Sequence, residues 1–193
     1  DVPAIIEYTR QYFLLEEEEV VVAHYGELRF YAPDGTPIEK KAKIANWSVE
    51  QAQKGGYPCF MQKEIHEQPR ALADTIDGRT KDGFVTFEGD GLPDGFFRDV
   101  TKLYVSACGT AMYSGMVGKA IIEKLARLPV EVEVASELRY RDPIFTPGCA
   151  AVVVSQSGET AETLAALRHF KENHIPVIGI VKVVGSSIAR QAY

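Results

Sequence analysis

The chain has 193 residues and carries 21 Lys and Arg against 27 Asp and Glu, which gives a formal net charge of −6. This acidic balance argues against a nucleic-acid-binding protein that relies on a basic surface, and it gives no reason to expect an anionic membrane as partner. With 46% hydrophobic and 25% charged residues, the composition is that of a folded globular protein. The longest unbroken apolar run, Cys149–Val154, is far shorter than the roughly 20 residues of a membrane-spanning helix.

Residues 1–45 have the character of short strands. Apolar runs at 12–15 and 20–23 flank the acidic run 16–19, which we interpret as a solvated turn, and a further strand-like segment follows at 27–31. Asp34-Gly35, flanked by such runs, predicts a hairpin turn, and residues 40–44 predict a further strand. We expect these strands to pair in antiparallel hairpins and to expose apolar side chains.

Helical patterns follow between residues 46 and 78. Ser48-Val49-Glu50-Gln51 fits a capping box and predicts a short helix that ends at Gly55-Gly56. Residues 59–67 predict a second helix, and Pro69 predicts the start of a third that ends before Gly78. Residues 79–98 are rich in glycine and have little periodicity, so they predict a loop.

From Val100 onward, strand and helix patterns alternate. Strands are predicted at 102–107, 130–134, 150–154 and 177–181, and helices at 110–127, 136–140, 159–172 and from 186 onward. The helix at 110–127 places Val117, Ala120, Ile121 and Leu125 on one face. This alternation predicts an α/β fold with a parallel sheet flanked by helices.

The strongest local motif is Ser155-Gln156-Ser157-Gly158-Glu159-Thr160, which lies between a buried strand and a helix. Hydroxyl and amide side chains at a helix N-terminus favour an anion. No Lys follows, so the motif is not a nucleotide-binding P-loop, and a phosphate monoester held by neutral donors fits better. The alternative is a simple helix cap, because Ser157 alone would cap the helix. Composition does not decide between the two.

Two further loops follow strands of the same predicted sheet, Cys108-Gly109-Thr110 and Val183–Ser187. Binding sites in such sheets gather at the carboxyl ends of the strands, so these loops are expected to share one crevice with the motif at 155–160. Cys108 has no identifiable base and is interpreted as a structural thiol, and all three cysteines are expected to be reduced. No histidine has metal-ligand spacing, so neither a metal site nor a cofactor is predicted.

These segments, together with Glu137–Arg141, occur in an order and at a spacing that resemble one enzyme family. It is the family of glutamine–fructose-6-phosphate aminotransferases (isomerizing), or glucosamine-6-phosphate synthases. Residues 55–69 resemble its interdomain linker, and residues 1–10 resemble the late part of its glutaminase domain.

The resemblance implies the fold and the domain organisation. Residues 1–45 would be the C-terminal tail of a glutaminase type 2 domain of the Ntn-hydrolase (αββα) class, contributing a short antiparallel β tail. Residues 46–78 would be a helical linker. Residues 79–193 would be the first sugar-isomerase (SIS) subdomain, flavodoxin-like and truncated at its C-terminus.

The resemblance also implies a function in making glucosamine 6-phosphate from fructose 6-phosphate and glutamine, a step in hexosamine and UDP-N-acetylglucosamine synthesis. The residues that would bind the sugar phosphate are Thr110, Ala111, Ser155, Gln156, Ser157, Thr160 and Val183. Ala111 stands where the family usually has Ser, so only its backbone could contribute. The catalytic cysteine and the second SIS subdomain are not in this sequence, so the chain holds no catalytic residue and is expected to be inactive alone.

The implied partners are fructose 6-phosphate, glucosamine 6-phosphate and further copies of the chain, joined as a homo-oligomer through the SIS domain. The implied location is cytoplasmic. One alternative is a non-catalytic, regulatory sugar-phosphate-binding module of the same fold, and another is a remnant with only scaffold value. The linker and the strand-rich N-terminus favour the enzyme segment, because a lone sensor has no need of a glutaminase tail.

Overall fold

The computed structural model describes residues 8–44, 54–93 and 95–193, so the predicted capping-box helix at Ser48 lies outside the described residues. The chain divides into two compact units, Asp1–Thr75 and Ile76–Tyr193. Each unit has its own sheets, and no sheet is shared between them in the described part of the chain.

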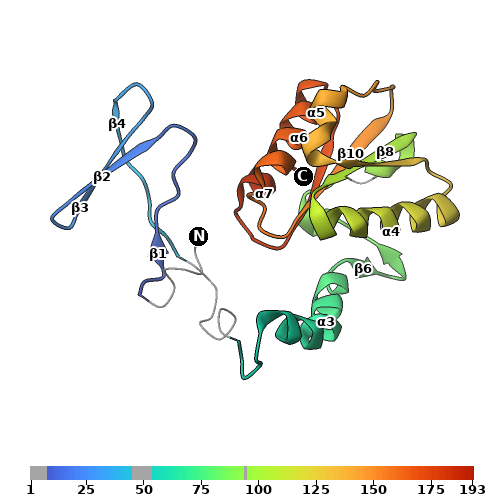
Figure 1. Ribbon diagram of the computed structural model, residues 1–193, viewed down its shortest axis with the longest axis horizontal. Coiled ribbons are helices and arrows are strands. Elements are labelled where there is room, and N and C mark those ends of the chain that lie inside the picture. The colour runs from blue at the N-terminus through green and yellow to red at the C-terminus, as the bar shows by residue number, and fades with distance from the viewer. Residues whose placement is uncertain (1–7, 45–53, 94) are drawn as a thin grey trace. The chain divides into compact units, whose positions relative to one another are not determined.

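The first unit carries short antiparallel strands (Figure 1): β1 (Gln11–Tyr12), β2 (Val20–His24), β3 (Glu27–Tyr31), β4 (Pro37–Ile38) and β5 (Lys43–Ile44). β2, β3 and β4 form one sheet, and β1 pairs with β5. Asp34-Gly35 lies in the β3–β4 turn as predicted, and the Asp34 carboxylate accepts the Thr36 N–H at 2.9 Å. The β2–β3 turn at Tyr25-Gly26 was not predicted. Both of its residues have positive φ (44° and 86°), as a two-residue hairpin of type I′ requires.

The strands of the first unit leave apolar side chains exposed, which confirms that prediction. Val20, Val22 and Leu28 are each about half exposed. Phe30 is the one buried hydrophobic side chain in the described part of this unit, and its ring lies 4.9 Å from that of Phe13. So little buried apolar area leaves these strands dependent on a further surface for stability.

Residues 60–76 form a single helix, α3 (Phe60–Ile76), which continues through Pro69. The prediction of two helices separated at Pro69 is therefore wrong. Proline removes its own N–H donor and its ring crowds the carbonyl four residues earlier, which here belongs to Ile65. Ile65 is 54% exposed, so water can take the missing hydrogen bond and the helix need not break.

The second unit is built on four parallel strands: β8 (Lys102–Ala107), β9 (Val130–Val134), β10 (Cys149–Ser155) and β11 (Val177–Val181). Their spatial order is β11-β10-β8-β9, which is the flavodoxin-like arrangement. The helices are α4 (Gly109–Leu125), α5 (Ala135–Arg141), α6 (Ala161–Glu172) and α7 (Ser187–Gln191). The predicted α/β fold with a parallel sheet flanked by helices is confirmed.

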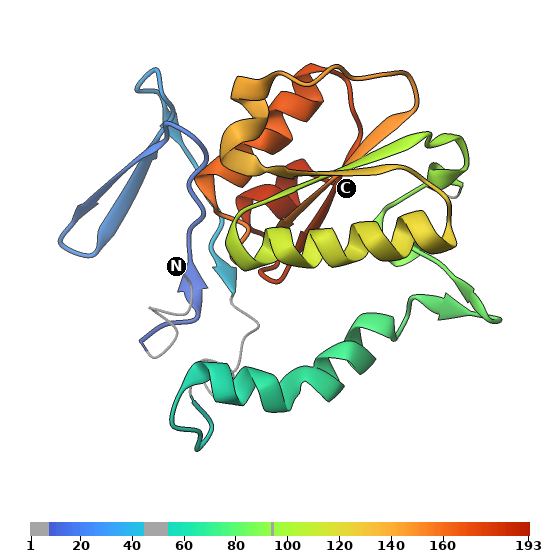
Figure 2. The ribbon, with the colours of Figure 1, turned by 45° about the vertical axis from the view of Figure 1, so that its right-hand side comes forward.

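Helices cover both faces of this sheet. Figures 1 and 2 show α4 on one face and α5 and α6 on the other. On the α5–α6 face, Tyr104, Leu138, Val153 and Phe170 belong to one buried cluster. On the α4 face, a smaller cluster includes Val105 and Val152, against which Ile122 packs.

The apolar face predicted for α4 points away from the sheet. Val117, Ile121 and Leu125 are 61%, 52% and 76% exposed. The helix instead presents Gly115 to the sheet, where an added Cβ would lie 2.8 Å from Val105 Cγ1. The close approach thus depends on a small residue, and the apolar side chains of the predicted face are left on the outer surface.

The segment predicted as a loop at 79–98 contains short regular pieces. β6 (Thr80–Lys81) and β7 (Phe84–Val85) form a small hairpin, followed by 3₁₀ turns at Glu88–Asp90 and Phe96–Asp99. Asp82-Gly83, with φ of 52° and 81°, makes the hairpin turn. The prediction missed this Asp-Gly signal because its flanking strands are only two residues long.

Candidate functional site

The strand order reverses between β8 and β10, and open α/β sheets generally form their binding crevice at the carboxyl ends of the strands at such a point. The chain passes from β8 to β9 on one side and then crosses back to β10 on the other side of β8. The helices that follow β8 and β10 therefore leave toward opposite faces of the sheet. The loops between such neighbours form the usual binding crevice of open α/β sheets.

The strand register brings the predicted site residues to this edge. Ala107 pairs with Val154, and Ser155 pairs with Val181, so β8, β10 and β11 end at one level. The predicted residues all lie at or just beyond these ends: Thr110 and Ala111 in the first turn of α4, Ser155 at the end of β10, Gln156, Ser157 and Thr160 in the loop before α6, and Val183 in the loop after β11. The edge therefore gathers hydroxyl, amide and backbone groups from three loops.

The loop after β10 is folded around the side chain of Ser155. The Ser155 hydroxyl is buried, accepts the Gly158 N–H at 3.0 Å and lies 3.0 Å from the Thr160 hydroxyl. The Ser157 hydroxyl accepts the Glu159 N–H at 3.2 Å. Each hydroxyl keeps hydrogen-bonding capacity beyond these contacts, since a hydroxyl offers one donor and two acceptor positions.

The alternative in which Ser157 caps the helix is wrong. The N-cap of α6 is Thr160, and its side chain makes no capping hydrogen bond. The N-cap of α4, Cys108, makes none either. The N–H groups of a first helical turn have no intrahelical partner and carry partial positive charge, so the starts of both helices offer backbone donors at this edge of the sheet.

Gly158 joins this loop to the one that follows β11. It has φ +68°, and an added Cβ would lie 2.0 Å from Ser186 Oγ and 2.5 Å from Ser186 Cβ. The Gly158 carbonyl accepts the Ile188 N–H at 3.0 Å, and Glu159 Oε1 accepts the Ser187 N–H at 2.8 Å. The roles of Glu159 and Ser186 were missed from the sequence. The signal for a close approach was Gly158 itself, but nothing in the sequence identifies its partner.

The cysteines and the acidic side chains of the described residues are the candidates for a further centre. All three cysteines are free; Cys108 is half-buried against the core and Cys149 is buried, with its sulfur 3.3 Å from the Thr146 hydroxyl. In the described ranges, no three His, Cys, Asp or Glu side chains gather closely enough to hold a metal ion. No helix in those ranges is long and apolar enough to cross a membrane.

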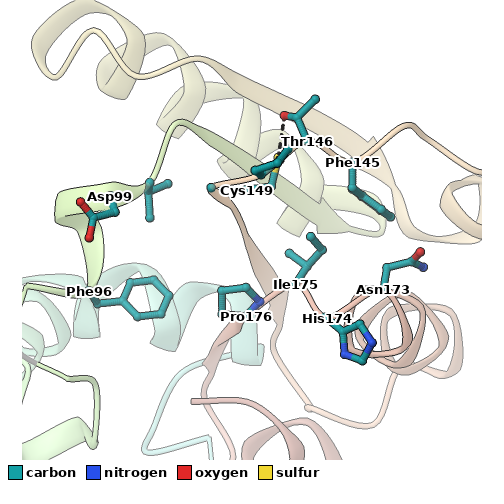
Figure 3. Close-up of a pocket in the computed structure, with 12 residues that line it drawn as sticks. Phe96, Asp99, Phe145, Thr146, Cys149, Asn173, His174, Ile175 and Pro176 are labelled. Atoms are coloured by element: carbon teal, nitrogen blue, oxygen red, sulfur yellow. Dashed lines mark hydrogen bonds between the residues drawn. The ribbon is translucent and has the colours of Figure 1, made fainter.

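A cavity of about 500 Å³ lies at the opposite edge of the sheet. It opens where β10 and β11 begin, between the rings of Phe96 and Phe145 and beside Ile175 and Pro176 (Figure 3). None of the predicted site residues lines it. The cavity is therefore separate from the edge where the predicted site residues lie.

An ionic cluster stabilises the edge strand β9. Glu131 pairs with Lys102 and Arg141, and Arg141 also lies 2.5 Å from Glu133. Hydrogen bonding from Lys102 is the main cause that lowers the pKa of Glu131 to about 2, whereas burial raises the pKa of Glu133. Lys102 begins β8, so this cluster lies toward the amino ends of the strands and has a structural role.

Comparisons with known proteins find curated relatives that align with the whole chain. The family model described as SIS domain matches residues 96–193. The glutamine–fructose-6-phosphate aminotransferase (isomerizing) of Clostridium acetobutylicum is 47% identical over 193 residues, and that of Caldanaerobacter subterraneus subsp. tengcongensis is 45% identical over the same length. Both matches cover 100% of this chain but only 32% of the relative, so the chain spans about a third of the length of these curated relatives.

A solved structure adds the same likeness in three dimensions. The C-terminal domain of glucosamine–fructose-6-phosphate aminotransferase from Francisella tularensis superimposes with a TM-score of 0.65 and 39% identity. The superposition covers 72% of this chain and 39% of that one.

Proposed function

The chain belongs to the SIS domain family, and we propose that it is the sugar-phosphate-binding segment of a glutamine–fructose-6-phosphate aminotransferase (isomerizing). The reaction would join ammonia from glutamine to fructose 6-phosphate and give glucosamine 6-phosphate. The observation that carries this proposal is the 47% identity to such an enzyme over all 193 residues, across both units of the chain. A lone binding module of the same fold has no reason to preserve the strand-rich first unit.

The geometry of the crevice supports a phosphate ligand. Uncapped N-termini of α4 and α6 supply backbone donors, and Thr110, Ser155, Ser157 and Thr160 supply hydroxyls. We propose that these groups, with Gln156, hold the phosphate, and that Val183 lines the sugar. Ala111 is half-buried and lacks a hydroxyl, so in this proposal its contribution is its backbone N–H.

The proposal assigns a part to each segment of the chain. Residues 1–45 would be the tail of the glutaminase domain, 46–78 the linker, and 79–193 the first SIS subdomain. The exposed valines of β2 would then be covered by the body of the glutaminase domain. The free cysteines fit the reducing interior of a cytoplasmic enzyme.

We further propose that the outer face of α4 is where a second copy associates. Its exposed apolar side chains are Tyr113, Met116, Val117, Ile121 and Leu125. A continuous apolar stripe on a helix surface is typical of an association surface. Val117→Lys with Ile121→Lys is expected to shift the full-length protein to a smaller species in light scattering, whereas Lys124→Glu should not. An unchanged mass for the double variant would remove this face from the proposal.

The activity is tested with the full-length protein that carries this segment and with the 193-residue chain alone. The full-length protein should form glucosamine 6-phosphate and glutamate from fructose 6-phosphate and glutamine. The isolated chain should form neither, because the glutaminase nucleophile and the second SIS subdomain are outside it. Activity of the isolated chain, or inactivity of the full-length protein with these substrates, would contradict the proposal.

A further inference from the structure

The loops after β10 and β11 are connected by two hydrogen bonds and one tight contact. Glu159 Oε1 accepts the Ser187 N–H at 2.8 Å, and the Gly158 carbonyl accepts the Ile188 N–H at 3.0 Å. Between them, Ser186 packs so closely on Gly158 that no Cβ fits there. The two loops are therefore in direct contact through both their backbones and their side chains.

This connection continues to Val183. The carbonyl of Val183 accepts the Ser186 N–H at 3.3 Å, which closes the turn before α7. Ser186 in turn caps α7, because its hydroxyl accepts the Ala189 N–H. A path of direct contacts thus runs from Glu159 through the first residues of α7 to the residue proposed to line the sugar.

Glu159 also carries a negative charge one residue before Thr160. A free carboxylate there would repel a bound phosphate, since like charges destabilise each other at short range. The hydrogen bond to Ser187 gives this carboxylate a partner in the neighbouring loop. Charge-assisted hydrogen bonds of this type are stronger than neutral ones.

We infer that Glu159 is a positioning residue that holds the Val183 loop against the phosphate loop, so that the sugar and the phosphate of one ligand are bound together. The inference rests on the proposed function and deepens it. Inorganic phosphate needs the 155–160 loop and the start of α4 but not the Val183 loop, whereas fructose 6-phosphate needs the Val183 loop as well. Loss of the Glu159–Ser187 contact should therefore weaken the binding of the sugar phosphate and leave the binding of inorganic phosphate unchanged.

The test measures dissociation constants of both ligands for the full-length protein and its variants by calorimetry. Glu159→Ala is expected to raise the dissociation constant of fructose 6-phosphate about tenfold and to leave that of inorganic phosphate within about twofold of the parent value. Glu159→Gln keeps the acceptor oxygen and should stay near the parent for both ligands. Glu159→Asp is one methylene shorter and should resemble Glu159→Ala.

Glu162→Ala is the matched control, because Glu162 is an exposed carboxylate in the first turn of the same helix. It removes the same charge but leaves the hydrogen bond between Glu159 and Ser187 in place. The inference is overturned if Glu159→Ala and Glu162→Ala weaken the binding of fructose 6-phosphate equally. It is also overturned if Glu159→Ala weakens the binding of fructose 6-phosphate and of inorganic phosphate equally. If the parent protein binds fructose 6-phosphate no better than fructose, the proposed function itself fails and the inference falls with it.

Amide hydrogen exchange gives a second measurement that does not depend on ligand. The Ser187 amide should exchange faster in Glu159→Asp than in Glu159→Gln, although both variants keep a polar side chain. Equal exchange in the two would show that the contact does not order the loop and would overturn the inference even where Glu159→Ala fails to fold.

Discussion

Substituting Gly158 by alanine should destabilise the second unit far more than an ordinary loop glycine would. An L-residue at φ +68° costs about 1–2 kcal/mol. The added Cβ would also meet Ser186 Oγ at 2.0 Å and Cβ at 2.5 Å, so Ser186 must move. Its capping bond to α7 is worth about 1 kcal/mol, and the bond from Ile188 to Gly158 about 1 kcal/mol. We expect a total loss of roughly 3–4 kcal/mol.

Gly185→Ala is the matched control, because Gly185 has φ +77° with nothing within 4 Å of an added Cβ. Its free energy of unfolding should fall only by the backbone cost of about 1–2 kcal/mol. Urea denaturation followed by circular dichroism measures both variants. Ser186→Gly opens the crowded space and retains a tolerated cap residue, so Gly158→Ala should cost roughly 2 kcal/mol less in that background. Equal costs for Gly158→Ala and Gly185→Ala would refute the close approach of the two loops.

Two further predictions concern α4 and the ionic cluster. Gly118 has open space around it, so Gly118→Ala should raise the free energy of unfolding by about 0.5–1 kcal/mol. Gly115→Ala should lower it by about 1–3 kcal/mol, because the added Cβ would lie 2.8 Å from Val105 Cγ1. The opposite order of stability in urea titrations would contradict the observed packing of α4 on the sheet. The pKa of Glu131 is lowered to about 2 from its ordinary value, so its stabilising effect is complete above about pH 4.5 and is lost as the pH falls toward 2. Glu131→Gln should therefore be less stable than the parent by roughly 2 kcal/mol at pH 7, and the difference should shrink between pH 4.5 and 2 in unfolding titrations. A stability difference independent of pH would contradict the pairing with Lys102.

The parallel sheet could be predicted closely because local patterns and tertiary packing agree there. The predicted strands at 102–107, 130–134 and 177–181 have the observed bounds. Pro69 misled the prediction, since the cost of a proline inside a helix depends partly on whether water can replace the lost hydrogen bond, and the exposure of Ile65 cannot be read from the sequence. The outward face of α4 was misjudged for a similar reason. Apolar periodicity indicates one face of a helix, but in this helix the face that packs most closely on the sheet carries Gly115, because a larger side chain does not fit there.

The residues of the proposed site could be named from the sequence, but the contacts that hold their loops together could not. Hydroxyls after a buried strand identify the loop at 155–160, and parallel topology brings Thr110 and Val183 to the same edge. The contacts of Gly158 and Glu159 with α7 depend on how two loops pack across neighbouring strands. Sequence patterns carry no information on such long-range contacts, which is why that link emerged only from the structure.

The most direct test of the proposed phosphate site measures fructose 6-phosphate affinity and melting temperature together for Ser155→Ala and Thr160→Ala in the full-length protein. Each hydroxyl would donate to a charged acceptor, an interaction worth roughly 1.5–3 kcal/mol, so affinity should fall by about tenfold or more. Glutaminase activity measured without the sugar phosphate should barely change, because these residues lie in the second unit. If both variants instead lose about 1 kcal/mol of stability and bind fructose 6-phosphate as tightly as the parent, the hydroxyls only order the loop and the phosphate site is contradicted.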